Sequence, residues 1–322
     1  MVILVTGGLG FIGSHTCTEL LNHNYELIVI DNLSNCKESV KEKIELIAKK
    51  KIHFIKCDLR SRFLLRNVFK YNGICAVIHF AGCKAVGESV ENPLKYFNNN
   101  TLGTINLLSI MDEYRCRNLI FSSSCTVYGN PKYLPIDERH PYETLNPYGR
   151  TKHYIDTMLK DLHTSDKKWN ICSLRYFNPV GKHKSGLIFE DPNGIPTNLF
   201  PYIHKVMKQE YDVLKIFGGD YNTRDGTPIR DYIHIEDLAD AHVKALKFIE
   251  TQKGCMEYIN LGTGNGYSVL EVVKMFEIMY KINIPYKIVG RREGDAEEVY
   301  SDNTKAYNLL KWTPKLGLEQ MV

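Results

Sequence analysis

Residues 1–13 read MVILVTGGLGFIG, and the fold assignment starts from them. Residues 2–5 are apolar without a polar break, which is typical of a strand buried on both faces of a parallel sheet. The glycines that follow match G-x-G-x-x-G at positions 8, 10 and 13, and G-x-x-G-x-x-G at positions 7, 10 and 13. Glycine allows a tight turn, a close approach of the backbone to a pyrophosphate and close helix–strand packing. The stretch therefore predicts a strand, a phosphate-binding turn and a helix whose N-terminus faces the phosphates.

Such a turn also occurs for purely structural reasons, so its surroundings matter. Residues 25–30 (YELIVI) are a second apolar run, and they end in Asp31. Asp31 follows Gly13 by 18 residues, near the spacing of roughly 20 that is typical of an acidic residue on the adenosine ribose. A carboxylate there accepts hydrogen bonds from the ribose hydroxyls and repels a 2′-phosphate. The expected cofactor is therefore NAD rather than NADP.

Composition excludes several classes of protein. A length of 322 residues suits about two domains of roughly 150 residues each. The net charge of +4, from 41 basic and 37 acidic residues, is too small to indicate a nucleic acid or a membrane surface as partner. The nine cysteines include no C-x-x-C pair and no Cys/His cluster, so we expect reduced thiols, a cytoplasmic location and no metal site. No apolar run approaches the length of a membrane span.

Strand-like and helix-like segments alternate up to about residue 175. Further strands are predicted at 53–57, 76–80, 118–121 and 169–174, and helices at 37–50, 61–71, 93–114 and 148–163. This alternation predicts an α/β fold, a Rossmann-type doubly wound parallel sheet that binds ligands at the carboxyl ends of its strands. We expect an NAD-binding domain at 1–175 and a smaller mixed α/β substrate domain at 176–322, with a segment of about 230–262 packing back onto the first.

The second half carries fewer clear signals. Residues 176–201 are rich in Pro, Gly and Asn and are predicted to form loops around a substrate. A strand is predicted at 212–217, and a short strand followed by an Ala-rich helix within 229–250. Residues 260–266 (NLGTGNG) form a second glycine-rich turn, before a helix capped by Ser268. One interpretation is a second dinucleotide site, but a tight turn beside the sheet is favoured because no strand ending in an acidic residue follows.

Tyr148 and Lys152 are four residues apart and so lie on one face of a helix. Such pairs are common on exposed helices, but here a run of three serines, 122–124, ends the strand upstream. The phenol of tyrosine has a pKa near 10, and a nearby ammonium and a positively charged nicotinamide both favour the phenolate. A hydroxyl, a Tyr and a Lys beside a nicotinamide predict removal of a hydride and a proton from a secondary alcohol.

Twelve motifs together resemble one family. The chain is similar to the UDP-glucose 4-epimerase (UDP-galactose 4-epimerase) family of extended short-chain dehydrogenases/reductases. The matches follow the family order over nearly the whole chain, and several are particular to the epimerases. They are VTGGLGFIGSHT, VIDNL, VIHFAGCKAVGESV, FSSSCTVYG, NPYGRTK, LRYFNPVG, GIPTNLFPYI, IFGGDY, DGTPIRDYIH, DLADAH, NLGTG and RREGD.

The resemblance implies an NAD site with contacts along the whole cofactor. At the pyrophosphate it implies Gly7, Gly10, Phe11 and Ile12; at the adenosine ribose Asp31 and Asn32; and at the adenine Asp58 and Leu59. Along the cofactor it implies Phe80, Ala81, Gly82 and Lys84, and around the nicotinamide Asn99, Ser122, Tyr148, Lys152 and Tyr176.

The resemblance also implies a UDP-hexose site in residues 176–322. The implied substrate contacts are Lys84, Ser124, Tyr148, Asn178, Asn198, Leu199, Phe217, Arg230, Tyr232, Arg292, Asp295 and Val299. Arginine suits a diphosphate, and Asp295 suits a ribose diol. The implied catalytic residues are Tyr148 as base, Ser124 as its helper, and Lys152.

The implied reaction is the reversible inversion of carbon 4 of UDP-hexoses. A proton and a hydride leave carbon 4, the flat 4-keto sugar turns about its diphosphate link, and both return to the other face. The resemblance further implies a homodimer formed through the helices at 93–114 and 148–163.

Three rival interpretations fit the sequence less well. A nucleotide-sugar 4,6-dehydratase shares the fold and the Tyr/Lys pair but needs an acidic pair just after the hydroxyl residue, where this chain has Cys125 and Thr126. A UDP-glucuronate decarboxylase would also need a Glu there. A catalytically idle NAD-binding module would have no reason to keep Ser124, Tyr148 and Lys152.

One departure from the family bears on substrate range. Members restricted to UDP-glucose and UDP-galactose tend to carry a bulky Tyr four residues after the aspartate of RREGD, beside carbon 2 of the sugar. Here that position is Val299, and Tyr300 follows it. We therefore expect UDP-GlcNAc and UDP-GalNAc to be interconverted too, unless a one-residue shift places Tyr300 at the gate.

Overall fold

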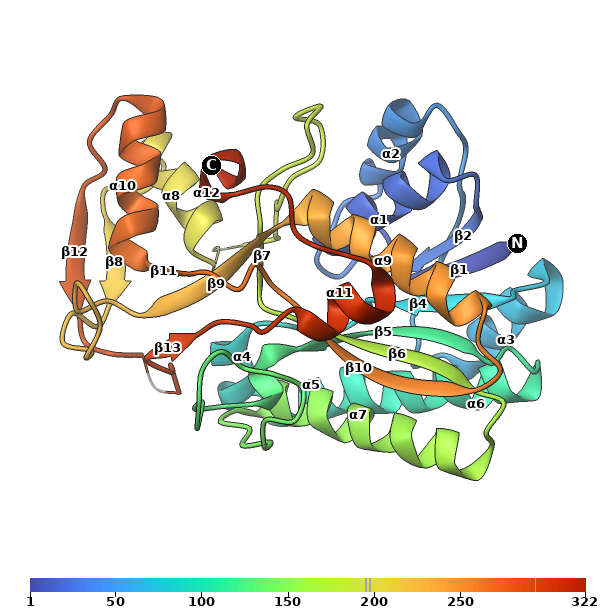
Figure 1. Ribbon diagram of the computed structural model, residues 1–322. Helices are drawn as coiled ribbons and strands as arrows, with labels where there is room; N and C mark the ends of the chain where they lie inside the picture. Colours follow the sequence, from blue (N-terminus) through green and yellow to red (C-terminus); the bar gives the residue numbers. More distant parts are fainter. Residues whose placement is uncertain (195, 197, 293) are drawn as a thin grey trace.

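A parallel sheet of seven strands forms the centre of the computed structural model, which describes residues 1–194, 196, 198–292 and 294–322 (Figure 1). The strand order is β10-β6-β5-β4-β1-β2-β3. The chain runs outward from β1 to β3, returns to the other side of β1 with β4, and continues to the opposite edge. The strands are β1 (Val2–Thr6), β2 (Glu26–Asp31), β3 (His53–Lys56), β4 (Ala76–His79), β5 (Asn118–Ser124), β6 (Asn170–Tyr176) and β10 (Cys255–Leu261). This confirms the predicted doubly wound parallel sheet.

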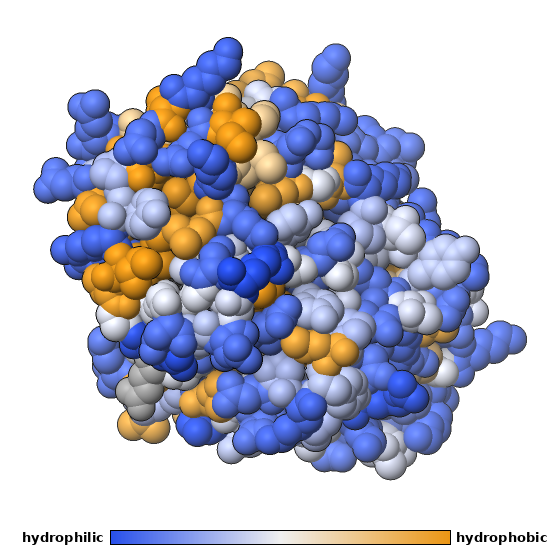
Figure 2. Space-filling view, turned by 60° about the vertical axis from the view of Figure 1, so that its left-hand side comes forward, coloured by the Kyte–Doolittle hydropathy of each residue, from blue (hydrophilic) through white to orange (hydrophobic). Residues whose placement is uncertain are grey.

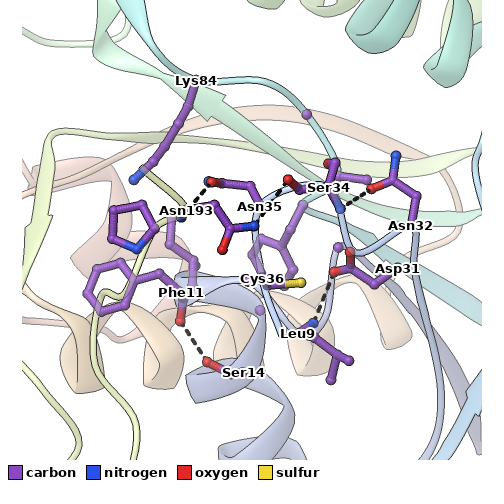
Figure 3. Close-up of a pocket in the computed structure, with 18 of the residues that line it drawn as sticks. Leu9, Phe11, Ser14, Asp31, Asn32, Ser34, Asn35, Cys36, Lys84 and Asn193 are labelled. Atoms are coloured by element: carbon purple, nitrogen blue, oxygen red, sulfur yellow. Dashed lines mark hydrogen bonds between the residues drawn. The ribbon is translucent and has the colours of Figure 1, made fainter. Parts of the chain in front are cut away.

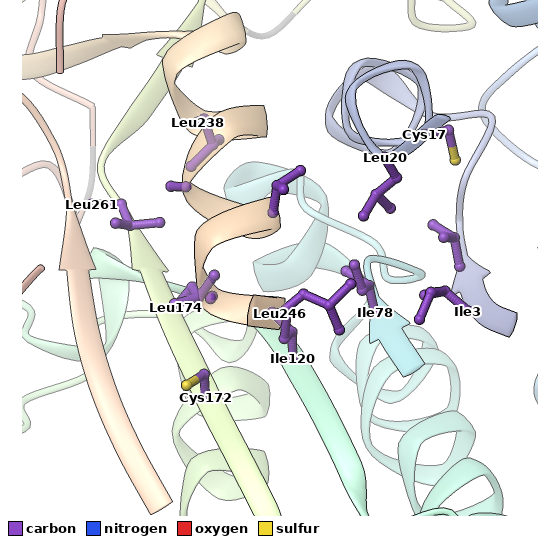
Figure 4. Close-up of a cluster of buried hydrophobic side chains, with 14 of the residues drawn as sticks. Ile3, Cys17, Leu20, Ile78, Ile120, Cys172, Leu174, Leu238, Leu246 and Leu261 are labelled. Atoms are coloured by element: carbon purple, nitrogen blue, oxygen red, sulfur yellow. The ribbon is translucent and has the colours of Figure 1, made fainter. Parts of the chain in front are cut away.

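Helices cover both faces of this sheet (Figure 1). One face carries α1 (Phe11–Asn22), α2 (Val40–Ala48) and α9 (Ile235–Glu250), and the other carries α3 (Arg62–Asn72), α6 (Gly103–Glu113) and α7 (Pro147–Ser165). Ile3 and Leu20 belong to the apolar core that α9 completes with Leu246 (Figure 4). Leu4, the next residue of β1, belongs to the core on the opposite face. Burial on both faces explains why β1 has no polar break.

The predicted helix at 93–114 is not regular. It consists of α5 (Pro93–Tyr96), a wider π-helical turn at Phe97–Leu102, and α6. In this turn Asn100 Oδ1 accepts a hydrogen bond from Cys83 N (2.8 Å), and Asn100 Nδ2 donates to Cys83 O (3.0 Å). Turns of this kind are frequent at functional sites, and this one fixes the loop after β4. A short helix before it, α4 (Val86–Glu91), was not predicted.

The C-terminal part contributes two smaller sheets. β9 (Ile229–His234) pairs with β7 (Asn178–Val180), β11 (Gly266–Ser268) and β13 (Glu298–Val299), and β8 (Leu214–Phe217) pairs with β12 (Tyr286–Val289). Around them lie α8 (Leu199–Met207), α10 (Val269–Tyr280), α11 (Thr304–Leu310) and α12 (Leu318–Met321). The chain returns to the large sheet through α9 and β10, which pairs with β6. The division into two domains at residue 175 stays a prediction.

Two elements lie where none was predicted. β7 and the start of α8 fall within 176–201, which was expected to consist of loops. Pro201 contributed to that expectation, but it lies in the first turn of α8, where a missing N–H costs nothing. β10 was missed because it is an edge strand whose first four residues are only half buried.

The second glycine-rich turn binds a carboxylate of the chain itself. Asp231 is fully buried, and its side chain accepts hydrogen bonds from Thr263 N (2.7 Å) and Gly264 N (3.0 Å). The same carboxylate accepts hydrogen bonds from Ser301 N (3.1 Å) and Ser301 Oγ (2.7 Å). The backbone N–H groups of the turn are therefore directed at Asp231, which favours the tight-turn interpretation over a second dinucleotide site.

Hydrophobic side chains gather on one part of the surface, over α10 and β12 (Figure 2, upper left). Ile278, Met279, Ile282 and Ile288 are exposed there. Among the described residues, no helix combines the length and the apolar character that crossing a membrane requires.

Candidate active site at the carboxyl edge of the large sheet

The glycine turn lies between β1 and α1 and is too tight for side chains. Gly7 has φ +66°, and a Cβ on it would lie 2.7 Å from Ala81 N. A Cβ on Gly13 would lie 2.3 Å from Gly7 O. Gly10 caps α1 without a side-chain hydrogen bond, and the first turn of α1 has no acidic residue. The first N–H groups of α1 are therefore available to an anion, and the turn fits a pyrophosphate.

Asp31 ends β2 beside this turn (Figure 3). Its Oδ2 accepts a hydrogen bond from Leu9 N (3.3 Å), and its Oδ1 accepts one from Leu33 N (2.9 Å). Asn32 Nδ2 donates to Asp58 Oδ2 (2.9 Å), which links the ends of β2 and β3. Hydrogen bonds from Arg60 hold the pKa of Asp58 well below its usual range, so Asp58 is an anion at neutral pH. Asp31 and Asp58 are thus both fixed by hydrogen bonds at the carboxyl ends of β2 and β3.

A cavity of about 720 Å³ joins these groups at the carboxyl ends of the strands. It lies where the strand order reverses, on both sides of β1, which is the usual ligand position in such sheets. Its volume suits a large ligand. The predicted residues that line it are Gly7, Gly10, Phe11, Ile12, Asp31, Asn32, Asp58, Leu59, Phe80, Ala81, Gly82, Lys84, Asn99, Ser122 and Asn198.

The predicted catalytic residues lie at the ends of β5 and α7. Asn146 caps α7 by accepting a hydrogen bond from Gly149 N (2.9 Å), and Pro147 opens the helix. Lys152 Nζ donates to Ser122 O at 2.5 Å and lies 5.9 Å from the centroid of the Tyr148 ring. Ser124 Oγ accepts hydrogen bonds from Thr126 N (3.2 Å) and Thr126 Oγ1 (3.0 Å). The structure therefore brings Ser124, Tyr148 and Lys152 to one place.

Burial controls the protonation of this group. It raises the pKa of Tyr148 to about 12, and a hydrogen bond with Ser124 opposes the rise. Burial also lowers the pKa of Lys152 to about 8, and the negative charge of Asp156 opposes that fall. The predicted lowering of the pKa of Tyr148 includes the positive charge of a bound nicotinamide, so it stays a prediction; in the cofactor-free protein the cost of burying a phenolate dominates.

Tyr176 ends β6, and a hydrogen bond with a buried histidine occupies its hydroxyl, so no role in proton transfer is assigned to it. Its hydroxyl is 2.5 Å from His242 Nε2, and His242 Nδ1 is 2.8 Å from Leu238 O. The carbonyl can only accept, so we assign the ring proton to Nδ1, and Tyr176 donates to Nε2. His242 packs against Phe80 at 4.9 Å between ring centroids. No role was predicted for His242, although it lies in the DLADAH motif.

The implied UDP-hexose contacts surround β9. Arg230 and Tyr232 are two residues apart on β9; Asn178 of β7 pairs with Tyr232, and Val299 of β13 pairs with Arg230. Arg230 Nη2 lies 3.6 Å from Asp295 Oδ1. These residues do not line the dinucleotide cavity; nor do the remaining implied contacts Ser124, Tyr148, Leu199, Phe217 and Arg292.

Phe217 lies at the end of β8, and the guanidinium carbon of Arg292 is 4.4 Å from the centroid of its ring. Leu199 is the first residue of α8, next to Asn198. The loop before β13 is thereby tied to β8 by a cation–π contact. Apart from Lys84 and Asn198, which line the dinucleotide cavity, the implied substrate contacts lie outside that cavity.

Val299 and Tyr300 face opposite ways from β13. Val299 is buried in an apolar cluster with Phe177 and Ala296, against which Cys125 packs. Tyr300 lies on the side of β11, where a Cβ on Gly266 would meet its ring at 3.4 Å. Cys125 follows the predicted helper Ser124 directly, so Val299 and not Tyr300 is on the side of the catalytic group.

Glu190 is a residue that sequence reasoning missed. Its Oε1 accepts hydrogen bonds from Lys84 Nζ (2.5 Å) and Asn198 Nδ2 (2.8 Å), so it joins two predicted contacts. Its position in a polar loop gave no signal, because Lys84 lies 106 residues away in the sequence and the spacing of 8 residues to Asn198 matches no regular element. Among the described residues, no group of three or more His, Cys, Asp or Glu side chains is placed to hold a metal ion.

Comparison with known proteins agrees with the fold and the dinucleotide cavity described above. The model of the NAD dependent epimerase/dehydratase family matches residues 3–262. The UDP-glucose 4-epimerase of Bacillus subtilis (strain 168) is 51% identical over 321 residues, which cover 100% of this chain and 94% of that protein.

Two solved structures are similar over almost their full length. The crystal structure of UDP-glucose 4-epimerase from Bifidobacterium longum in complex with NAD⁺ and UDP has a TM-score of 0.97 at 47% identity, and the match covers 100% of this chain and 96% of that chain. The UDP-Glc/GlcNAc 4-epimerase from Campylobacter jejuni has a TM-score of 0.86 at 34% identity, covering 99% and 96%. With its doubly wound sheet, its glycine turn and these matches, the chain belongs to the NAD dependent epimerase/dehydratase family.

Proposed function

We propose that this chain is an NAD-dependent enzyme that interconverts UDP-galactose and UDP-glucose by inverting carbon 4 of the hexose. The observation that carries the proposal is the grouping of Ser124, Tyr148 and Lys152 beside a dinucleotide cavity. Asp31 at the ribose position favours NAD over NADP. The similar proteins from Bacillus subtilis and Bifidobacterium longum bear the name of this activity.

Each catalytic side chain has one task in this proposal. NAD, when bound, takes up the hydride from carbon 4 and returns it. Tyr148 Oη accepts the proton of the carbon 4 hydroxyl and later gives it back, with Ser124 Oγ sharing it. Because the pKa of Tyr148 is about 12 in the cofactor-free protein, the base forms only when positive charge is added beside it. Lys152 is held in place by Ser122 O.

The UDP part is held while the sugar turns. Arg230 and Arg292 suit the diphosphate, and Asp295, which lies near Arg230, suits the ribose hydroxyls. In this proposal the nucleotide supplies most of the binding energy, and weak sugar contacts allow the 4-keto sugar to present its other face.

The geometry disfavours a 4,6-dehydratase. That reaction needs an acidic pair just after the hydroxyl residue, but this chain has Cys125 and Thr126 there. Thr126 instead supports Ser124 through two hydrogen bonds. Neither of these two residues has the carboxylate that the elimination of water would require.

The proposal is tested by proton NMR of the purified protein with UDP-galactose and no added NAD. We expect the anomeric signal of UDP-glucose to appear, because the protein retains its cofactor. If NAD has to be added, retention is wrong but the activity stands. If UDP-glucose forms under neither condition, the proposed function is wrong.

We also propose that UDP-GalNAc and UDP-GlcNAc are interconverted. The support is the small side chain of Val299 beside Phe177 and Cys125, with Tyr300 turned toward β11. The isopropyl group of Val299 is smaller than a phenol and leaves room for an N-acetyl group at carbon 2. The similar Campylobacter jejuni protein is named a UDP-Glc/GlcNAc 4-epimerase.

Val299→Tyr tests the gate. We expect the turnover of UDP-GalNAc to fall by more than tenfold while that of UDP-galactose changes little, because a phenol would fill the space for the N-acetyl group. Val299→Ile, which adds only one methylene, is the matched control. Equal loss of both activities, or no loss of either, would contradict the gate.

A homodimer and a cytoplasmic location complete the proposal. Leu94, Leu102, Ile105 and Tyr154 are exposed on the helical segments predicted to form the interface. Light scattering should give the mass of two chains, and Leu94→Lys with Ile105→Lys should give the mass of one. All nine cysteines are free, which suits the reducing cytoplasm.

A further inference from the structure

Residues 187–193, here called the strap, lie against the dinucleotide cavity although they belong to the segment between β7 and α8. All seven of them line the cavity. Backbone contacts hold the start of the strap in place. Lys182 pairs with Phe189 as an isolated antiparallel bridge, and His183 N donates to Ile188 O (2.9 Å). A segment of the C-terminal half therefore forms a wall of the site that the N-terminal half builds.

One end of the strap is attached to the loop after β2. Asn193 N donates a hydrogen bond to Asn35 Oδ1 (3.2 Å), and Asn193 Nδ2 donates one to Ser34 O (3.3 Å; Figure 3). Lys37 Nζ and Asp191 Oδ2 form an ion pair at 2.8 Å. This loop carries Asp31 and Asn32 at its start, so the strap reaches the adenosine side of the cavity.

A second attachment joins the strap to the loop after β4. Glu190 Oε1 binds Lys84 Nζ at 2.5 Å, and the Glu190 side chain is only 9% exposed. The same oxygen binds Asn198 Nδ2, just before α8. Glu190 thus connects a predicted contact of the cofactor with a predicted contact of the substrate.

The strand order shows where the strap lies relative to the glycine turn. β2 and β4 are the two neighbours of β1, so a segment attached to the loops after both of them crosses the glycine turn between β1 and α1. A dinucleotide whose pyrophosphate lies at that turn is then enclosed between the turn and the strap. The cofactor cannot leave through this side until both attachments are broken.

We propose that the strap retains the dinucleotide and that Glu190 and Asp191 are positioning residues that hold it closed. This inference rests on the proposed function, since it takes the cavity to be the NAD site. The pair of Lys37 and Asp191 is exposed, so its removal changes the equilibrium by only about threefold. The less exposed Glu190 contributes more. Retention of NAD is therefore a sum of several weak attachments rather than one strong contact.

The test measures the rate at which NAD leaves the protein. Protein loaded with NAD is freed of unbound cofactor and mixed with ethanol and an excess of alcohol dehydrogenase, so that each released NAD is reduced and its fluorescence is recorded. Lys37→Ala and Asp191→Ala should each release NAD about threefold faster than the parent, and the double variant no faster than either single variant. Glu190→Gln should release it about tenfold faster or more.

Two controls separate the ion pair from general damage. The exchanged pair, Lys37→Asp with Asp191→Lys, should restore the parent rate, because it reverses the charges and keeps the attraction. Glu113→Ala removes an equally exposed ion pair, that of Arg66 and Glu113 on α3 and α6, and should leave the rate unchanged.

Release at the parent rate from all strap variants would overturn the inference, and so would an exchanged pair as fast as Asp191→Ala. A parent protein that retains NAD and converts UDP-galactose while the strap variants behave as it does refutes the strap alone. A parent that binds no NAD and converts no UDP-galactose refutes the proposed function instead.

Discussion

Lys152 shows at the scale of one residue that the catalytic group is not arranged for stability. Its side chain is 5% exposed, and burial lowers its pKa from 10.5 to about 8. This displacement corresponds to about 3 kcal/mol of unfavourable free energy at neutral pH. Below pH 8 both the folded and the unfolded protein carry this proton, so the full cost is present. Between pH 8 and 10.5 only the unfolded protein keeps it, so this contribution to stability improves as the pH rises.

Lys152→Met should therefore abolish most of the activity and yet stabilise the cofactor-free protein at pH 7. We expect a gain of about 2 kcal/mol, the cost of the buried charge less about 1 kcal/mol for the lost bond to Ser122 O. The gain should shrink as the pH is raised from 8 toward 10.5. Urea unfolding at several pH values measures it, and a variant less stable than the parent at pH 7 would refute the argument.

Arg292 and Arg291 are adjacent but have different surroundings. The Arg292 guanidinium stacks on Phe217, and Arg291 Nε donates to Asp220 Oδ1 (2.8 Å) while its guanidinium stacks on Tyr221. Of these two arginines, Arg292 is the one with no carboxylate partner among the described residues, and it is free to bind a diphosphate.

Arg292→Ala should weaken the binding of UDP by roughly tenfold or more, since a bond to a charged group contributes about 1.5–3 kcal/mol. Arg291→Ala is the matched control and should change the affinity by less than about threefold. Calorimetric titration with UDP compares the two. Equal affinities in both variants would contradict the role of Arg292 as the diphosphate contact.

At the scale of elements, one buried carboxylate fixes α7 against the sheet. Asp156, which is 1% exposed, accepts hydrogen bonds from Ser123 Oγ of β5 (3.2 Å) and Ser173 Oγ of β6 (2.5 Å). It also pairs with Arg175 Nη2 at 2.9 Å, and Arg175 is fully buried. Asp156 follows Lys152 by one helical turn, and Ser123 lies between Ser122 and Ser124. The network therefore sets the distance between the two halves of the catalytic group.

Asp156→Asn should lower the free energy of unfolding by about 3–5 kcal/mol, because it leaves the Arg175 charge buried without a counter-charge. Asp161→Asn, the same substitution at an exposed position of α7, should change it by less than about 0.5 kcal/mol. Urea unfolding measures both. If the two variants are equally stable, the network does not hold the helix.

The elements that the sequence predicted well are those with local signals. β1, β2 and α10 have an apolar period and recognisable ends, such as Ser268 at the cap of α10. The π-helical turn at Phe97–Leu102 depends on Asn100 binding Cys83, a contact between distant residues, so no local pattern indicates it. α8 was missed because Pro201 lies in its first turn, and β10 because it is a half-buried edge strand.

The site shows the same division. The glycines and Asp31 were predictable because they lie in one β–α–β unit, and the cavity includes them. Glu190 was not, since its contact with Lys84 joins residues that are 106 positions apart in the sequence. The pKa of Tyr148 in the cofactor-free protein could not be predicted from the sequence, because the degree of burial is a tertiary property.

At the scale of the molecule, the reaction needs both halves of the chain. The large sheet supplies the dinucleotide cavity and the proposed catalytic group, and the strands around β9 carry residues that are proposed to bind the UDP-hexose. α9 and β10 connect the two by returning to the large sheet after β9. The strap crosses back in the other direction. In the proposed function, this arrangement keeps cofactor and sugar facing each other through both steps of the reaction.

The central claim is that the hydride taken from carbon 4 returns to carbon 4 of the same sugar. The most direct test uses UDP-galactose with deuterium at carbon 4 and the protein as purified, without added NAD. If the same hydride returns, UDP-glucose keeps the deuterium at carbon 4, and NMR and mass spectrometry detect it there. Loss of the deuterium to water, or a product that has lost water from the sugar, would contradict it.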